Sequence, residues 1–322
     1  MTVRTARAWP EENGSDAPIF VLAPPLSFGS LLCAALGQHP QLYGVADLNL
    51  LQAADMREYW SGQAESAQPR PPVARLFLHD GLLRTVSQLY AGEQTFDGIE
   101  MAKRWVRVRL ARTTVDVHGE LRRKISPLRM VESSSAYVTK ARFLERLCTA
   151  FPKARFIHVL RHPRSHGEAL MQKAAFPLWA FFQNAIDRRT SVPLVDPQIL
   201  WHDINVRILD VLDRLASDRY YRIRGETFLS ENANTLRRLC KWLGLSTSGR
   251  AIRAMMQLEA SPFSRIGPVN ARHGCDADFL ERPSFDWHVA CPAKLDGPLS
   301  WRPDGATFHP RVSTLARAFG YE

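Results

Sequence analysis

The sequence has few cysteines and no long apolar run, and each absence excludes a class of protein. No apolar run approaches the roughly 18 residues that a membrane helix needs. The N-terminal stretch has no apolar signal core, so we expect residues 1–17 to be a flexible tail on a cytoplasmic protein with no membrane partner. The five cysteines form no C-x-x-C pair, and their odd number gives no disulfide framework. We therefore expect no structural metal.

The chain as a whole is basic, with 42 Lys and Arg residues against 32 Asp and Glu residues and a net charge of +10. This excess favours an anionic ligand or partner, although a solvated basic surface explains the number equally well. No aromatic-and-basic recognition motif accompanies the charge, so we do not expect a nucleic-acid partner. The sequence is compatible with a homo-oligomer.

Helix-like and strand-like segments alternate along residues 18–260. Short apolar runs predict buried strands at 19–22 and 154–160 and a weaker strand within 220–229. Helix-spaced apolar residues predict helices at 31–36, 76–90, 99–117, 141–150 and 233–243. The alternation predicts one α/β domain with a central parallel sheet flanked by helices. Residues 261–322, rich in Pro, Gly and aromatic residues, are expected to wrap that domain as an irregular C-terminal extension.

The stretch PIFVLAPPLSFGSLLCAALGQHP, residues 18–40, runs from a strand through a Ser- and Gly-containing turn into a helix, and it contains no Lys or Arg. Such a turn gathers backbone N–H groups and the positive end of the helix dipole. It is not a G-x-x-x-x-G-K-[ST] loop, because the lysine is missing and the spacing differs. The pattern predicts an anion site, with a plain structural turn as the alternative; its residues are Ser27, Phe28, Gly29, Ser30 and Leu31.

A second basic feature follows the predicted strand in RFIHVLRHPRSHGEALM. Arg161 ends the strand and Arg164 lies three residues on, at the start of a helix-like run. Paired guanidinium groups suit a phosphate, since their fork of donors matches its oxygens. A surface arginine cluster is the alternative interpretation.

Three stretches resemble, in the same order, the bacterial sulfotransferases that use 3′-phosphoadenosine 5′-phosphosulfate (PAPS). FVLAPPLSFGSLLCAALGQHP is similar to their 5′-phosphosulfate loop, MVESSSAYVTKARFLERLCTAFPKARFIHVLRHPRS to their 3′-phosphate segment, and YRIRGETFLSENANTLRRLCKWLGL to the end of their core. The resemblance implies a P-loop-like α/β fold with a helical lid. It also implies PAPS as co-substrate without a metal, the turn as the 5′-phosphosulfate loop and Arg161 as the 3′-phosphate ligand.

The chain departs from the family pattern at the donor contacts. Leu26 falls where the family keeps a Lys or Arg, and Phe28 falls on a glycine. Ser133 replaces a lysine, Ala169 a serine and Gly225 a tyrosine. A hydrogen bond to a charged group contributes about 1.5–3 kcal/mol, so the loss of two cationic contacts weakens donor stabilisation by about 3–6 kcal/mol. Cations from elsewhere in the chain are candidate substitutes: Arg104, Arg107, Arg109 and His79.

Asp47 falls where the family commonly places a catalytic glutamate, and Asn49 takes the place of a frequent histidine. A carboxylate there could accept the proton of an acceptor hydroxyl. The alternative is that Asp47 caps a helix over LNLLQAADM, for which aspartate is well suited.

Two functions remain open on the sequence. One is transfer of a sulfuryl group from PAPS to a hydroxyl of a small molecule or a carrier-bound acyl chain, as in secondary metabolism. The other keeps the fold and abandons PAPS, leaving a binding or scaffold protein or an enzyme with another reaction. Both predict the same fold, so donor binding separates them.

Overall fold

The computed structural model describes residues 17–61, 78–190, 192–287 and 294–322. The predicted N-terminal tail lies, apart from Ala17, outside the described residues. No helix among the described residues is long and apolar enough to cross a membrane.

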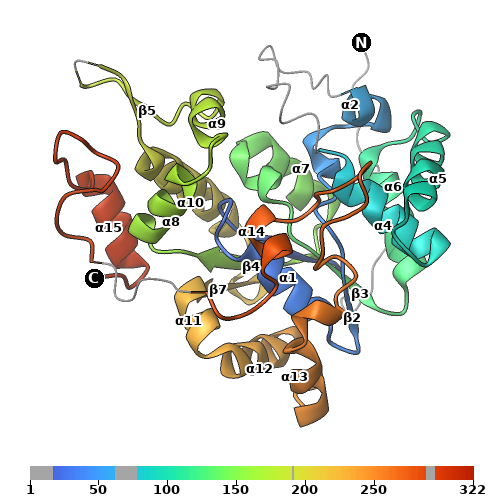
Figure 1. Cartoon of the computed structure of the whole chain (residues 1–322). Helices are drawn as coiled ribbons and strands as arrows, with labels where there is room; N and C mark the ends of the chain where they lie inside the picture. Colours follow the sequence, from blue (N-terminus) through green and yellow to red (C-terminus); the bar gives the residue numbers. More distant parts are fainter. Residues whose placement is uncertain (1–16, 62–77, 191, 288–293) are drawn as a thin grey trace.

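Five parallel strands form the central sheet in the order β2-β3-β1-β4-β7 (Figure 1). Their bounds are β1 (Ile19–Leu22), β2 (Leu42–Gly44), β3 (Arg129–Glu132), β4 (Arg155–Leu160) and β7 (Tyr220–Arg224). The central strand β1 pairs with β3 on one side and with β4 on the other. The chain leaves β1 toward one edge of the sheet and later adds β4 and β7 on the opposite side. The carboxyl ends of β1 and β4 therefore form the switch point at which open α/β sheets bind ligands.

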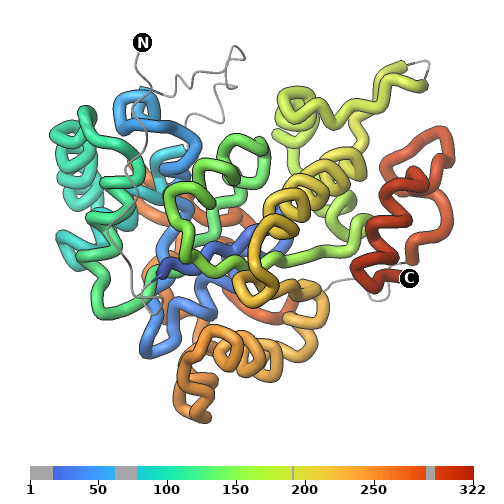
Figure 2. Tube along the Cα trace, turned by 180° about the vertical axis from the view of Figure 1, so that it is seen from behind, coloured from blue at the N-terminus to red at the C-terminus, as the bar shows by residue number. Residues whose placement is uncertain are grey.

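The residues of β1 explain its central place. All four are buried, as a strand covered by helices on both faces requires. Ile19 and Val21 pack in the layer of α1 (Gly29–Gly37), α12 (Asn232–Leu243) and α13 (Gly249–Met255), whereas Phe20 and Leu22 pack in the layer of α7 (Ala141–Ala150) and α10 (Pro197–Leu212). Figures 1 and 2 show these helices around the sheet. The alternation of side chains along a strand thus distributes this single apolar run between two cores.

Helices cover both faces and one end of the sheet. Those of the two layers are α1 (Gly29–Gly37), α7 (Ala141–Ala150), α10 (Pro197–Leu212), α12 (Asn232–Leu243) and α13 (Gly249–Met255). A third group, α4 (Asp80–Ala91), α5 (Phe96–Arg107) and α6 (Thr114–Ile125), packs beside β2 and β3 (Figure 1). The others are α2 (Met56–Ser61), α8 (Pro163–Met171), α9 (Phe176–Phe182), α11 (Gly225–Ser230), α14 (Ala277–Glu281) and α15 (Pro310–Ala318), with a two-stranded hairpin, β5 (Ile186–Asp187) and β6 (Leu194–Val195).

The predicted helix at 99–117 is wrong, because two helices, α5 and α6, occupy that stretch. The chain breaks after Arg107, and Thr113 starts the second helix by accepting a hydrogen bond from the backbone N–H of Asp116. The strand predicted at 19–22 is confirmed, and the strand at 154–160 is confirmed to within one residue. The weaker strand within 220–229 ends at Arg224, where α11 begins.

Segments beyond residue 261 contact the sheet layers at separate places. Phe279 and Leu280 of α14 are buried in the layer of α1. Helix α15 packs against α10, with Val312 beside Trp201 in a separate apolar cluster. Arg302 is buried at this end and pairs with Asp187 and Asp196, each at 2.8 Å. The predicted division at residue 261 stays a prediction.

Candidate functional site

The turn between β1 and α1 has an unusual backbone. Leu26 and Phe28 both have left-handed φ angles, of 59° and 65°. The Ser27 N–H donates to the Pro24 carbonyl at 3.1 Å, and Phe28 stands at the N-cap of α1 without a side-chain cap. The left-handed region costs a non-glycine residue about 1–2 kcal/mol, so surrounding contacts must hold this shape. The first N–H groups of α1 open onto the turn without partners inside the helix.

The two serines of the turn differ in their surroundings. Ser27 is fully buried, and its Oγ has no hydrogen-bond partner among the described residues. The Oγ of Ser30 accepts a hydrogen bond from the backbone N–H of Asp276 at 2.9 Å. An unpartnered buried hydroxyl is costly in a folded protein, and a bound water or a ligand in the turn would supply its partner.

Gly29 brings the turn close to the end of β3. A Cβ added at Gly29 would lie 2.6 Å from the Oγ of Ser133. The residue that aligns with the family's lysine therefore lies directly against the turn. Ser133 is buried there, and its neutral hydroxyl does not provide the missing charge.

Arg161 brings a cation to the turn from the end of β4. Its Nη1 donates to the carbonyl of Leu26, and its Nε donates to the Oγ of Ser165 at 3.3 Å. Its guanidinium carbon lies 4.8 Å from the ring centroid of Phe28. Burial lowers the pKa of Arg161, and the nearby Glu226 carboxylate opposes that effect. The structure thus brings Arg161 to the turn at Leu26 and Phe28, with its Nη1 and Nε engaged within the protein.

Arg164 points to a different segment. Its guanidinium donates to the carbonyls of Lys294, Asp296 and Pro298 at 2.8–2.9 Å. These bonds hold the chain that follows residue 293 against the start of α8. The structure does not bring this side chain to the turn.

Phe28 fills space that a side chain at position 225 would need. A Cβ added at Gly225 would lie 2.3 Å from the Cδ2 of Phe28. On another side the ring packs edge-on against Trp287, with 6.1 Å between ring centroids. Two departures from the family pattern, Phe28 and Gly225, are therefore in direct contact and compensate for each other in volume.

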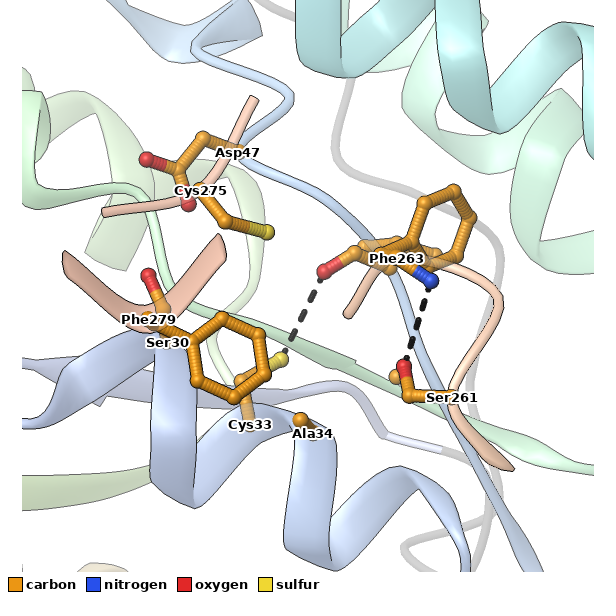
Figure 3. A pocket seen from close by; sticks show the side chains of 10 residues that line it. Ser30, Cys33, Ala34, Asp47, Ser261, Phe263, Cys275 and Phe279 are labelled. Carbon is orange, nitrogen blue, oxygen red and sulfur yellow. Dashed lines mark hydrogen bonds between the residues drawn. The ribbon is translucent and has the colours of Figure 1, made fainter. Parts of the chain in front are cut away.

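Asp47 lines a small pocket beside the turn, together with Ser30, Cys33, Cys275 and Phe279 (Figure 3). Its backbone N–H donates to the Gly274 carbonyl at 2.6 Å. Burial, followed by the carboxylates of Asp276 and Glu132, raises the pKa of the Asp47 carboxyl well above its usual value.

The capping alternative for Asp47 is wrong. A single 3-10 turn, Leu50–Gln52, follows it, and Asn49 stands at its N-cap position. Asp47 lies two positions before Asn49 and does not cap this turn. Its side chain lines the pocket instead.

Asp276 completes the site and was not predicted from the sequence. Its backbone N–H donates to the Oγ of Ser30, which brings Asp276 to the turn. Burial and the neighbouring Asp278 raise the pKa of Asp276 to about 6, while Leu26 N–H, Arg161 and Lys173 act in the opposite direction. No pattern around Asp276 signals this role, because its partner Ser30 lies 246 positions away along the chain.

The proposed substitute cations lie in the α4–α6 group or at its start. Arg109 pairs with Glu120 at 2.6 Å and stacks on Trp105, and the Nε2 of His79 is bonded to the Tyr59 carbonyl at 2.9 Å. Arg104 and Arg107 are exposed on α5. The structure brings none of these four to the turn. Among the described residues, no group of His, Cys, Asp and Glu has the arrangement of a metal site.

Comparison with known proteins places this geometry in a wider context. A family model described as "Sulfotransferase family" matches residues 18–249. A solved sulfotransferase domain from the curacin biosynthetic pathway is 21% identical, with a TM-score of 0.69 over 95% of this chain and 98% of its own. The sulfotransferase domain of the Synechococcus PCC 7002 olefin synthase is 19% identical, with a TM-score of 0.66 over 98% and 99%. A search of curated proteins found no match. The structural likeness confirms the predicted α/β fold.

Proposed function

Because this chain belongs to the sulfotransferase family, we propose that it transfers a sulfuryl group from PAPS to a hydroxyl of a small molecule or a carrier-bound acyl chain. The observation that carries the proposal is the Ser27 hydroxyl, which is buried without a partner in the described part of the chain and lies in a helix-start turn at the switch point of the sheet. The similar structures come from a biosynthetic pathway and an olefin synthase, which supports an acceptor from secondary metabolism. A cytoplasmic location belongs to the same proposal.

The turn would receive the 5′-phosphosulfate of the donor. The hydroxyls of Ser27 and Ser30 and the first N–H groups of α1 are its donors, and Gly29 allows close approach of the backbone. Arg161 would bind the 3′-phosphate by exchanging its bond to the Leu26 carbonyl for a charge-assisted one. Arg164 supports the site from outside by holding residues 294–298 against α8.

Asp47 would act as the base. The acceptor oxygen forms a bond to sulfur, the bond between sulfur and the 5′-phosphate oxygen breaks, and the acceptor proton passes to the Asp47 carboxylate. The charge that develops on the departing phosphate is stabilised by the turn N–H groups and by Arg161. The raised pKa of Asp47 makes its carboxylate a stronger base than that of an ordinary aspartate.

A second candidate function is a sulfotransferase fold that no longer uses PAPS. It is favoured by the engagement of the Arg161 donors with Leu26 and Ser165, and by the absence of a cation at Leu26 and Ser133. In that case the protein binds another ligand or serves as a scaffold.

Calorimetric titration with adenosine 3′,5′-bisphosphate, the donor's product, separates the two candidates. We expect micromolar affinity in the wild type and a loss of about 10- to 100-fold in Arg161→Ala, since a charged hydrogen bond contributes about 1.5–3 kcal/mol. Arg207→Ala is the matched control, because Arg207 also donates to a backbone carbonyl, Val138 at 2.8 Å, but from α10. No binding at millimolar nucleotide refutes the use of PAPS.

A further inference from the structure

We propose that Glu132 is a positioning residue for the base: acting through Ser134, it fixes the segment that carries Asp47 beside the turn that would receive PAPS. The inference rests on the proposed function, since it concerns how the base of that reaction is held in place. It gives Glu132 no part in the proton transfer itself.

Glu132 ends β3 and is fully buried. Its Oε1 accepts hydrogen bonds from the hydroxyls of Ser134 at 2.6 Å and Tyr137 at 2.7 Å, and its Oε2 lies 3.1 Å from the Nε2 of His118. A buried carboxylate is costly unless hydrogen bonds replace its hydration, so these contacts hold it in one position. Each hydroxyl has a single proton, and once that proton points to Glu132 the oxygen can only accept from other groups.

Both hydroxyls accept backbone N–H groups from the segment that follows Asp47. The Oγ of Ser134 accepts the N–H of Asn49 at 3.2 Å, and the hydroxyl of Tyr137 accepts the N–H of Leu51 at 3.4 Å. A single carboxylate oxygen therefore directs two hydroxyls that hold this segment at two points, two residues apart.

The bend at Asn49 depends on this support. Its φ of 55° lies in the left-handed region, which asparagine adopts more readily than most residues but still at a cost. Its Nδ2 donates to the carbonyls of Asp47 at 3.3 Å and Leu78 at 3.2 Å. The bend thus sets the direction of the chain at Asp47, whose side chain lines the pocket beside the turn (Figure 3). A strained bend persists only when surrounding contacts hold it, and the bond to Ser134 is one of them.

The end of β3 also contacts the turn. The Oγ of Ser133 lies against Gly29, where an added Cβ would be only 2.6 Å away. Of three consecutive residues, Ser133 therefore borders the turn, whereas Glu132 and Ser134 hold the base segment. One strand end fixes the base relative to the turn, and such geometry matters because a misplacement of about 1 Å costs about 10²-fold in rate.

Ser134→Ala tests the inference, because it removes the link between Glu132 and Asn49 with a small change in volume. We expect turnover of PAPS to fall about 10- to 100-fold, while the affinity for adenosine 3′,5′-bisphosphate stays within about twofold of the wild type. Radiolabelled PAPS is supplied with 4-nitrophenol, and the aryl sulfate and free sulfate are counted together. Transfer to the phenol or to water is then measured, and the natural acceptor need not be known.

Two variants of Glu132 separate its hydrogen bonds from its bulk. Glu132→Leu removes the acceptor of both hydroxyls at similar volume and should match the loss in Ser134→Ala. Glu132→Gln keeps an acceptor oxygen and should lose less than about fivefold. Should Glu132→Leu fail to fold, Ser134→Ala and Glu132→Gln carry the test. Ser87→Ala is the control and should turn over like the wild type, because Ser87 is buried on α4 and donates to the Glu93 carbonyl at 2.6 Å.

The Asp47→Asn background distinguishes positioning of the base from damage to the fold. If Ser134 acts through Asp47, Ser134→Ala should change turnover by less than about twofold once Asp47 is replaced. Damage to the fold lowers turnover by the same factor in both backgrounds. Hydrogen exchange locates the change: in Ser134→Ala the amides of residues 49–51 should exchange at least about tenfold faster than in the wild type.

The outcomes separate the inference from the proposed function. Equal losses in both backgrounds, or unchanged turnover in Ser134→Ala, overturn the inference and leave sulfuryl transfer from PAPS standing. Full turnover by Asp47→Asn also overturns it, because no base then remains at that position to be held. A wild type that neither binds the nucleotide nor turns over PAPS overturns the proposed function and the inference together.

Discussion

The contact between Phe28 and position 225 leads to a quantitative prediction. In Gly225→Ala the new methyl group would lie 2.3 Å from Cδ2 and 2.9 Å from Cε2 of Phe28, and 3.0 Å from the carbonyl of Leu160. The ring has little room to retreat, because Arg161 and Trp287 pack against it. Real Cβ atoms do not approach other atoms so closely, so either the ring or the start of α11 must move.

The expected coupling free energy follows from the packing at positions 28 and 225. Overpacking a well-filled site costs about 1–3 kcal/mol, and the better helix propensity of alanine offsets at most about 1 kcal/mol of it. Phe28→Ala should itself cost about 3–5 kcal/mol, as buried phenylalanines do. Once the ring is gone, the Leu160 carbonyl remains of the three atoms nearest to the new methyl group. We therefore expect the double variant to be about 1–3 kcal/mol more stable than the sum of the single effects.

Urea unfolding of the four proteins, followed by circular dichroism, measures the coupling as the difference between the double and single variants. Leu239→Ala, made in the wild type and in the Phe28→Ala background, is the control, because Leu239 is buried in the same layer on α12. Additivity within about 0.5 kcal/mol at Phe28 and Gly225 refutes the compensation argued here.

Two further predictions concern carboxylates. Asp47→Asn should leave nucleotide affinity unchanged and lower kcat by about 10²–10⁴-fold with an active acceptor. In the wild type, the rate should fall as the pH drops through the raised pKa of Asp47, because the carboxylate becomes protonated. Full activity in the variant contradicts the role of Asp47 as base. Arg302→Leu should cost about 3–5 kcal/mol of unfolding free energy at neutral pH, since it leaves Asp196 buried without its cation, while Asp187 keeps its second partner, Arg189. Arg302 also lowers the pKa of Asp304 to about 2. The stability that the Arg302–Asp304 pair contributes is therefore present above about pH 4 and is lost as the pH falls toward 2. Urea titrations at several pH values check this, and an identical acid transition in the variant argues against it.

Strands β1 and β4 could be predicted from the sequence because they are short, largely apolar runs, whereas β2 and β3 were not predicted, since LYG and RMVE are too short and too mixed in polarity to be recognised. Ile19–Leu22 is buried on both faces, and such a strand needs no partner information to be recognised. The helix pair at 96–125 was missed because apolar spacing continues through Val108 and Leu110. The available signal was Thr113 followed by Asp116, a helix-start pattern that periodicity alone does not weigh.

The turn of the candidate site could be predicted from the sequence for a local reason: strand, turn and helix are consecutive. The contacts that other segments make with that turn could not be predicted. The use of Arg161 by the Leu26 carbonyl and the arrival of Asp276 depend on segments that meet only in the folded chain. Comparison with the family motifs showed that Leu26 and Ser133 replace cations, but it gave no sign that Asp276 lies beside the same turn.

The packing of Phe28 against Gly225 also restricts the order in which these positions can change during evolution. A tyrosine at 225, as the family pattern has, collides with the present ring at its first carbon atom. A return to that pattern must therefore pass through a smaller residue at 28 before position 225 enlarges. A sequence with glycine at both positions can accept a larger residue at either one. Once Phe28 is present, an enlargement of position 225 is blocked. The two substitutions then persist together even where no function selects either of them.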